Sequence, residues 1–420
     1  MLATFRNAFR IADLRKRLFF TLYMFLIFRI GAHVPVPGIN RGYIENLLSQ
    51  GVLFGLLDTV SGGAFKTFSV FAMSVTPYIT SSIIVQLLTI VIPKWEAMQK
   101  EGAEGQKKLQ QYMRYGTVVL GLIQAFGMSY GIRSAIINPT LWSITLIALT
   151  LTAGTAFLMW LGELITENGI GNGISLIIFA GIVSRLPAGL GSMTKYLAES
   201  RINLLNVIIL GMLGLGVIAF VVWITEGQRR IPVQYAKRVV GRKMYGGQST
   251  HIPIRVNQAG VIPIIFAISV LMTPATIAQF IQRPFFQRLA SSLSGGRSAT
   301  YYIVYGILII FFTYFYTAVT FNPIEVANNM KKYGGFVPGL RPGKPTAEYL
   351  ERVLTRITLA GAVFLALIAV GIPYGVQLAT NIPNIWLGGT SLLIVVSVAL
   401  ETMKQLEAHL LMRHYQGFLK

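Results

Sequence analysis

Long apolar runs recur along the whole chain, separated by short segments rich in glycine and in polar or charged residues. The hydrocarbon core of a bilayer is about 30 Å thick, and a helix of about 20 mostly apolar residues crosses it. Ten runs have this character, although the fifth is short for a straight crossing. They predict transmembrane helices at residues 18–34, 69–92, 113–131, 141–162, 173–186, 203–225, 258–281, 301–321, 353–371 and 385–402.

Lysine and arginine fall unevenly on the loops between these runs. With the N-terminus in the cytoplasm, 26 of the 36 basic residues lie on the cytoplasmic side and nine on the other. Cytoplasmic loops of membrane proteins carry this excess of positive charge. An error in one span would reverse every later loop and remove the bias. The pattern therefore predicts that both termini are cytoplasmic.

Composition agrees with a polytopic membrane protein. The chain has 420 residues, of which 54% are hydrophobic and 12% are charged, whereas soluble domains average about 25% charged residues. A net charge of +21 is also typical of nucleic-acid-binding proteins, but here the basic residues cluster between apolar runs. The basic N-terminus followed by an apolar run imitates a signal peptide. No small-residue cleavage site follows that run, so we expect a retained first helix.

Two of the expected cytoplasmic loops are long. Residues 227–257 alternate apolar and basic positions on either side of a glycine-containing stretch, which predicts a β-hairpin. Residues 322–350 are rich in proline and glycine and are basic at their centre. Length and order-breaking residues favour docking surfaces over merely solvated loops.

The residues of an enzyme site are missing from this pattern. The four histidines are scattered, and neither a metal-ligand spacing nor a cofactor motif is present. The run GLRPGKP lacks the first glycine and the hydroxyl residue of a phosphate-binding loop. We therefore expect no catalysis, no metal and no cofactor.

Charge inside the spans is also sparse. The acids Glu163, Glu167, Glu226 and Glu401 lie at span ends, whereas ion-coupled transporters usually place ionisable groups near the membrane midplane. Arg29 lies inside the first span. Whether it extends to the external face of the membrane or has another role stays open at this point.

Two short features of the sequence cannot be assigned a function from residue spacing alone. The fragment FGLLDTVSGGAF (54–65) is half apolar, carries an acid and is too short to span a bilayer. Val75 and Ile79, like Ile174 and Ile178, are one helical turn apart. Such pairs are most often packing positions.

Several stretches together identify a family. They are FRIGAHVPVPGI (28–39), SGGAF (61–65), TPYITSSIIVQLL (76–88), QKKLQQYMRYGT (106–117), FLMWLGELITENGIGNGISLIIFAGIV (157–183), EGQRRIPVQYAKR (226–238), QSTHIPIRVNQAGVIPIIFA (248–267), FNPIEVANNMKKYGGFVPGLRPG (321–343) and GGTSLLIVVSVALE (388–401). Along nearly its whole length the chain resembles the SecY and Sec61-alpha family of protein-conducting channels.

The resemblance implies an all-α polytopic membrane protein, with ten transmembrane helices in two pseudo-symmetric halves around an hourglass pore. The halves would be residues 1–186 and 203–420, joined by an external hinge loop at 187–202. The constriction implied by the family's motifs is a ring of Val75, Ile79, Ile174, Ile178, Ile262 and Ile394, in which neighbours of Ile262 and Ile394 are alternatives. The fragment 54–65 becomes a plug, with Leu56, Leu57, Asp58, Ser61, Gly62 and Gly63 as its main residues.

The resemblance further implies a channel in the bacterial cell membrane that moves unfolded, signal-bearing polypeptides. It would release transmembrane segments through a lateral gate between spans two and seven, where Pro77 and Pro263 permit bending. The expected partners are SecE-like and SecG-like subunits, the SecA ATPase, the ribosome with its RNA, signal peptides, translocating chains and lipid. Arg341, and more weakly Arg238, Arg242 and Lys243, would bind SecA or the ribosome. The alternatives are an ion-coupled secondary transporter of small solutes and a scaffold without a pore.

Overall fold

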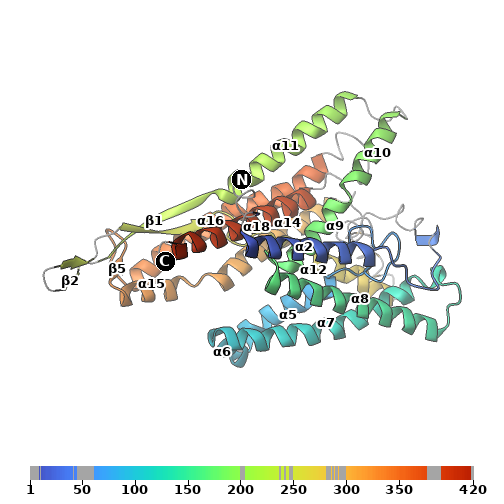
Figure 1. Ribbon diagram of the computed structural model, residues 1–420, viewed down its shortest axis with the longest axis horizontal. Coiled ribbons are helices and arrows are strands. Elements are labelled where there is room, and N and C mark those ends of the chain that lie inside the picture. Colours follow the sequence, from blue (N-terminus) through green and yellow to red (C-terminus); the bar gives the residue numbers. More distant parts are fainter. Residues whose placement is uncertain are drawn as a thin grey trace.

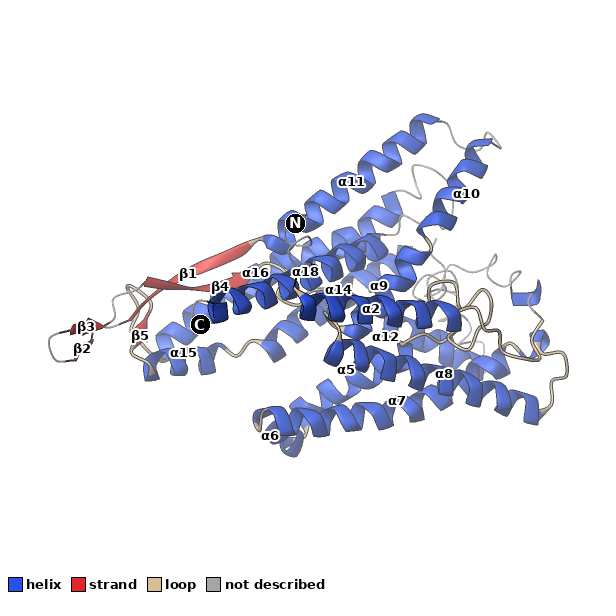
Figure 2. Ribbon diagram, in the orientation of Figure 1, coloured by secondary structure: helices blue, strands red, loops and turns tan. Residues whose placement is uncertain are grey.

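The computed structural model describes residues 11–40, 42–44, 61–198, 204–235, 238–240, 243–245, 249–280, 299–375 and 389–417, with the single positions 9, 285, 288 and 292. Long helices run side by side through most of this part of the chain, and a narrow β-structure projects from one end (Figure 1). Figure 2 shows that strands are confined to that projection.

Five helices of the first half lie over the first five predicted spans. They are α2 (Ala12–Gly31), α5 (Thr76–Val91), α7 (Ala103–Gly131), α8 (Leu141–Asn168) and α9 (Gly173–Ser184). Side-chain caps fix where two of them begin. Thr140 Oγ1 accepts a hydrogen bond from Ser143 N at 3.2 Å before α8, and Asn172 Oδ1 accepts one from Ser175 N at 3.1 Å before α9. Such oxygens pair with N–H groups that the first helical turn leaves free.

Five further helices lie over the predicted spans of the second half. They are α11 (Leu204–Glu226), α12 (Ile262–Phe280), α14 (Ala299–Thr320), α16 (Lys344–Ala366) and α18 (Gly389–Gly417), and α16 continues into a turn of π-helix, η2 (Leu367–Gly371). By length and composition, five helical stretches of the described chain could cross a membrane, or six if the bent pair α5 and α6 (Pro93–Lys100) forms one span. The all-α architecture is therefore confirmed, whereas the number of crossings stays a prediction.

The second predicted span, 69–92, is wrong at its start. The helix begins at Thr76, and residues Ser61–Val75, which we call the turn segment, are a series of turns. Phe68 and Ser74 have φ angles of +42° and +52° there. These left-handed conformations interrupt a right-handed helix. The apolar composition of residues 69–75 therefore does not distinguish this run of turns from a helix.

The turn segment is held by α2, by the residues that follow it and by α8. Val70 N donates to Val34 O at 3.0 Å, and Val36 N donates to Phe68 O at 3.0 Å. Phe71 stacks between Phe28 of α2 and Phe157 of α8, with ring centroids 6.2 and 5.9 Å apart. Aromatic pairs at these separations are favourable beyond the area that they bury. Hydrogen bonds within turns and to the residues after α2, together with packing on α2 and α8, therefore hold this segment in place of a continuous helix.

Two other boundaries differ from the sequence pattern. Helix α5 ends at Val91, and α6 leaves it at an angle of 102°. Pro93 opens α6 and lacks the N–H group that would continue the hydrogen-bond ladder of α5. Helix α10 (Leu186–Ala198) occupies most of the stretch 187–202 that we expected to be a loop.

The predicted hairpin is present. Strands β1 (Gln228–Tyr235) and β4 (Ser249–Arg255) pair antiparallel from Gln228↔Arg255 to Gln234↔Ser249, and the short strands β2 (Arg238–Val240) and β3 (Lys243–Tyr245) pair near its tip. A third strand, β5 (Gly335–Phe336), pairs with β1 through Gln234↔Phe336 and Tyr235↔Gly335. The two long loops therefore share one sheet of order β4-β1-β5, which we call the loop sheet.

An apolar cluster packs the loop sheet onto its own helices. The cluster includes Ile231 and Val233 of β1, Met330 of α15 (Pro323–Lys332), and Leu350 and Leu354 of α16. Alternate residues of β1 point to the same face, which explains the burial of its two aliphatic side chains. The loop sheet is therefore a packed subdomain.

Candidate pore constriction and docking surface

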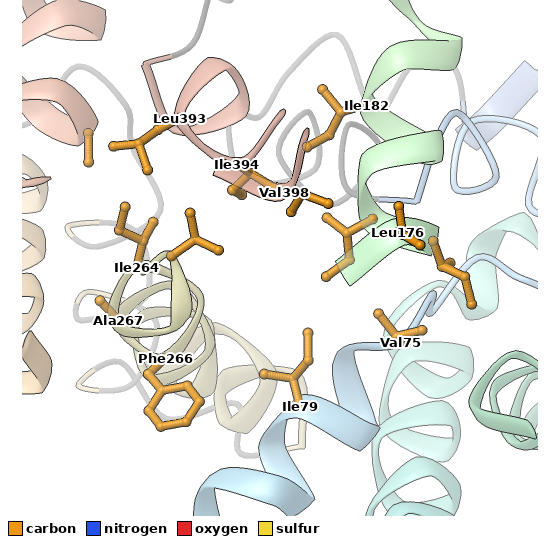
Figure 3. Packing of buried hydrophobic residues seen from close by; sticks show 14 of the residues in the cluster. Val75, Ile79, Leu176, Ile182, Ile264, Phe266, Ala267, Leu393, Ile394 and Val398 are labelled. Carbon is orange, nitrogen blue, oxygen red and sulfur yellow. The ribbon is translucent and has the colours of Figure 1, made fainter. Parts of the chain in front are cut away.

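Aliphatic side chains from four helices gather in one buried region (Figure 3). They come from α5, α9, α12 and α18 and belong to one buried cluster. All six residues expected in the ring are members of this cluster or pack against it. Val75, Ile79, Ile178 and Ile394 are its buried members, with exposed fractions of 0%, 7%, 2% and 3%. Ile174 and Ile262 are partly buried and pack against it.

Each pair of ring residues is set by the start of its helix. Val75 is the N-cap of α5, and its carbonyl accepts the hydrogen bond of Ile79 N at 3.1 Å. Ile174 and Ile178 lie in the first two turns of α9, directly after the Asn172 cap. The i,i+4 spacing places both members of each pair on the same side of their helix.

The ring residues on α12 and α18 have close apolar neighbours. Ile262 is the first residue of α12 and is partly buried, whereas Ile264 in the same helix is fully buried. Leu393 and Val398 lie beside Ile394 in the same cluster (Figure 3). The sequence left neighbours of Ile262 and Ile394 open as alternatives, because hydrophobicity alone does not distinguish a ring residue from any other core residue.

The aliphatic side chains of this ring offer no charge and no hydrogen-bond donor or acceptor. A narrow apolar ring removes the hydration partners of ions and water, and therefore resists leakage by dewetting. It also offers no fixed polar partner to a passing peptide. The arrangement, which we call the collar, suits a seal that does not select for sequence.

The SGGAF end of the predicted plug is described, whereas Leu56, Leu57 and Asp58 lie outside the described residues. Gly62 and Gly63 have φ angles of +68° and +89°. Glycine adopts such angles without steric cost. Ser61 is buried, and its Oγ accepts a hydrogen bond from Phe65 N at 3.2 Å.

The docking residues lie on or beside the loop sheet. Arg341 is exposed in the turn between β5 and α16, and its carbonyl accepts a hydrogen bond from Thr346 Oγ1 at 2.8 Å. Arg238 and Lys243 lie on the paired strands β2 and β3, but their side chains, like the whole of Arg242, fall outside the described structure. Sequence reasoning missed that β5 joins both loops.

Within the described residues, no group of three or more His, Asp or Glu side chains could hold a metal ion. Two of the acids at the span ends form ion pairs instead. Glu163 Oε1 lies 2.7 Å from Arg114 Nε, and Glu226 Oε1 lies 2.8 Å from Lys404 Nζ. These ion pairs connect α7 to α8 and α11 to α18.

Comparison with known proteins gives consistent results. The SecY family model matches residues 69–403. The chain is 48% identical over 433 residues to the protein translocase subunit SecY of Halalkalibacterium halodurans, which covers 100% of both chains. Among solved structures, it resembles one described as a protein-conducting channel, with a TM-score of 0.68, 20% identity, and coverage of 94% of this chain and 92% of that chain. It also resembles Sec61 in the canine ribosome-channel complex from the endoplasmic reticulum, with a TM-score of 0.65, 19% identity and the same coverage.

Proposed function

The chain belongs to the SecY family, and we propose that it moves unfolded, signal-bearing polypeptides across a membrane and releases transmembrane segments sideways into lipid. It is a multi-pass membrane protein and a subunit of a protein-conducting channel. The observation that carries this function is 48% identity over the full length to a translocase subunit. An ion-coupled transporter finds no support, and Glu163 and Glu226 form ion pairs with Arg114 and Lys404 of neighbouring helices.

In the proposed mechanism the collar closes around whatever occupies the pore. Val75, Ile79, Ile174, Ile178, Ile262 and Ile394 are its main residues. Convergence of α5, α9, α12 and α18 on one aliphatic cluster supports this assignment. Aliphatic side chains change rotamer without breaking hydrogen bonds, so the same ring fits chains of different bulk.

The segment 54–65 is proposed as the plug on the external side of the collar. The positive φ angles of Gly62 and Gly63 support a hinge at its end. Leu56 and Leu57 would rest against the collar, while Asp58 would face water.

The proposed lateral gate is the seam along α12, which contacts α5 and α7. Pro77 lies in the first turn of α5, and Pro263 is the second residue of α12. Both prolines stand in the first helical turn, where an N–H group has no intrahelical partner to lose, so they favour the start of a helix there rather than a bend within it. An apolar signal helix that wedges into this seam would enter lipid without exposing polar backbone.

Arg341 and the basic tip of the hairpin are proposed to bind SecA or the ribosome from the cytoplasm. Exposure of Arg341 beside the loop sheet supports this assignment. SecE-like and SecG-like subunits would complete the complex. The positive-inside bias supports cytoplasmic termini, and the identity to a bacterial translocase subunit supports a bacterial cell membrane.

Reconstitution tests the function directly. The purified chain, placed in vesicles with SecE-like and SecG-like subunits, should import a signal-bearing preprotein when SecA and ATP are supplied. Because the chain contains no cysteine, single cysteines at positions 79, 178 and 394 should crosslink to a stalled preprotein, whereas one at the exposed position Leu146 should not. A lack of import with all components present would contradict the function, and equal crosslinking at all four positions would contradict the collar.

A further inference from the structure

Arg29, the charged residue of the first predicted span, is tied to the turn segment. It lies in the last turn of α2. Its Nη1 donates hydrogen bonds to the carbonyl oxygen of Gly62 at 2.9 Å and to Ser184 Oγ at 3.2 Å. Gly62 belongs to the turn segment, and Ser184 is the last residue of α9. One side chain thus joins α2, the turn segment and α9.

The acceptor arrangement suits a cationic donor. The hydroxyl of Ser184 donates to Gly181 O at 2.7 Å and is 3.5 Å from Gly62 O. A hydroxyl has one proton, and the shorter contact takes it. The remaining lone pairs of Ser184 Oγ accept from Arg29. Of these two donors, the Arg29 guanidinium therefore makes the short hydrogen bond to the Gly62 carbonyl. Hydrogen bonds from a charged donor are stronger than those between neutral groups.

The absence of a side chain at Gly62 makes this contact possible. It is buried, and a Cβ atom at this position would lie 2.8 Å from Gly181 Cα. Only a residue without a side chain lets the turn approach the backbone of α9 so closely. This close approach removes the Gly62 carbonyl from bulk water. A buried carbonyl without a hydrogen-bond donor is unfavourable.

The turn segment needs external support. Between Gly62 and the collar residue Val75, the chain passes through Phe68 and Ser74 at positive φ, a conformation that side-chain-bearing residues rarely adopt. Ser74 Oγ is also buried without a hydrogen-bond partner among the described residues. The backbone between the tether and the collar thus holds a conformation that its own preferences oppose.

We propose that Arg29 is a positioning residue that fastens the turn segment to α9 and thereby keeps the collar closed at Val75. The inference rests on the proposed channel function. Without the guanidinium, the Gly62 carbonyl loses its charged donor and the turn segment separates more often from α9. Val75 then shifts relative to the rest of the collar, and ions pass.

The test is the ion current of planar bilayers containing the complex at rest, without SecA. Arg29→Gln should raise the resting leak by about tenfold, because loss of a charged hydrogen bond shifts an equilibrium by about that factor. Arg29→Lys keeps one cationic donor and should leak less than Arg29→Gln. Ser184→Ala removes only the bridging hydroxyl and should leak slightly. Arg133→Gln is the matched control, since Arg133 contacts the Tyr130 ring instead.

The outcomes separate this inference from the channel function. Preprotein import by the wild-type complex decides the function, and the resting current of the variants decides the tether. A wild-type current in Arg29→Gln, in a preparation that imports preprotein, would overturn the tether and leave the channel intact. Equal leaks in Arg29→Gln and Arg29→Lys with none in Ser184→Ala would also overturn it, because general damage to α2 would explain that result.

Discussion

The collar and the loop sheet are held by different kinds of contact. The collar consists of aliphatic side chains from four helices, and its contacts have no preferred direction. The loop sheet is a hydrogen-bonded ladder with a fixed register, and it presents the charged Arg341 at a defined point. Non-directional packing adapts to a changing occupant, whereas a fixed register presents the same surface to each partner. Changes in the docking surface of the loop sheet should therefore leave the resting seal unchanged, and changes in the collar should leave the docking surface unchanged.

Charge reversal at Arg341 should have the largest effect. Arg341→Glu is expected to lower SecA-driven import about thirtyfold or more, since reversing a charge at an interface costs several kcal/mol. The resting ion leak should stay at the wild-type level. Import assays and bilayer recordings on the same preparation measure both. Arg352→Glu, on the exposed surface of α16, is the control, and equal losses in the two variants would contradict a specific role for Arg341.

Polar side chains in the collar should give the opposite pattern. Ile79→Asn combined with Ile178→Asn is expected to raise the resting ion current about tenfold or more, because amides supply the hydration partners that an apolar ring withholds. SecA-driven import should continue. Ile79→Leu with Ile178→Leu conserves volume and polarity and should leave the leak unchanged. An unchanged current in the asparagine variant would remove these residues from the collar.

A methyl group beside the turn segment should reduce stability. A Cβ atom at Gly154 of α8 would overlap the Val70 carbonyl, so Gly154→Ala should lower the free energy of unfolding by about 1–3 kcal/mol. Thermal unfolding in detergent measures the change. Gly216→Ala in α11 is a matched control because a Cβ atom there has no neighbour within 4 Å, and its helix should be slightly stabilised. Equal melting temperatures would show that the turn segment yields easily.

Removing the cap of α8 should have the smallest effect. Thr140→Ala deletes the oxygen that accepts from Ser143 N and should destabilise the fold by about 1 kcal/mol. Resting leak and import should both stay at wild-type levels, because the cap lies away from the collar and from the loop sheet. Thr145→Ala, which removes a hydroxyl bonded within the same helix, should change less. A leak caused by Thr140→Ala would mean that the start of α8 supports the seal.

Local patterns predicted the elements, and non-local contacts decided the exceptions. Apolar runs located the helices, and alternation located the β1–β4 hairpin, because both signals lie within a few residues. The turn segment is apolar enough for a helix, but its conformation depends on Val34, Phe28 and Phe157, which are distant in sequence. The same holds for β5, whose two residues carry no strand signal and pair with β1.

The candidate site shows the same division. Spacing placed Val75 with Ile79 and Ile174 with Ile178, and family motifs were needed to give them a role in a pore. Charge identified Arg29 as unusual, but its partners Gly62 and Ser184 lie on two other elements. No sequence rule links a helix arginine to a distant glycine carbonyl, so this contact was visible only in three dimensions.

The β1–β5 pairing makes the two long loops a single mechanical part. β1 follows α11 and β4 leads to α12, whereas β5 lies between α15 and α16. A partner that pushes on either loop would therefore displace the whole loop sheet, which is connected along the chain to α11, α12 and α16. α12 lines the proposed gate, so a force on the loop that carries Arg341 would pass through β5, its paired strand β1 and then β4 to the seam through which a signal helix would leave.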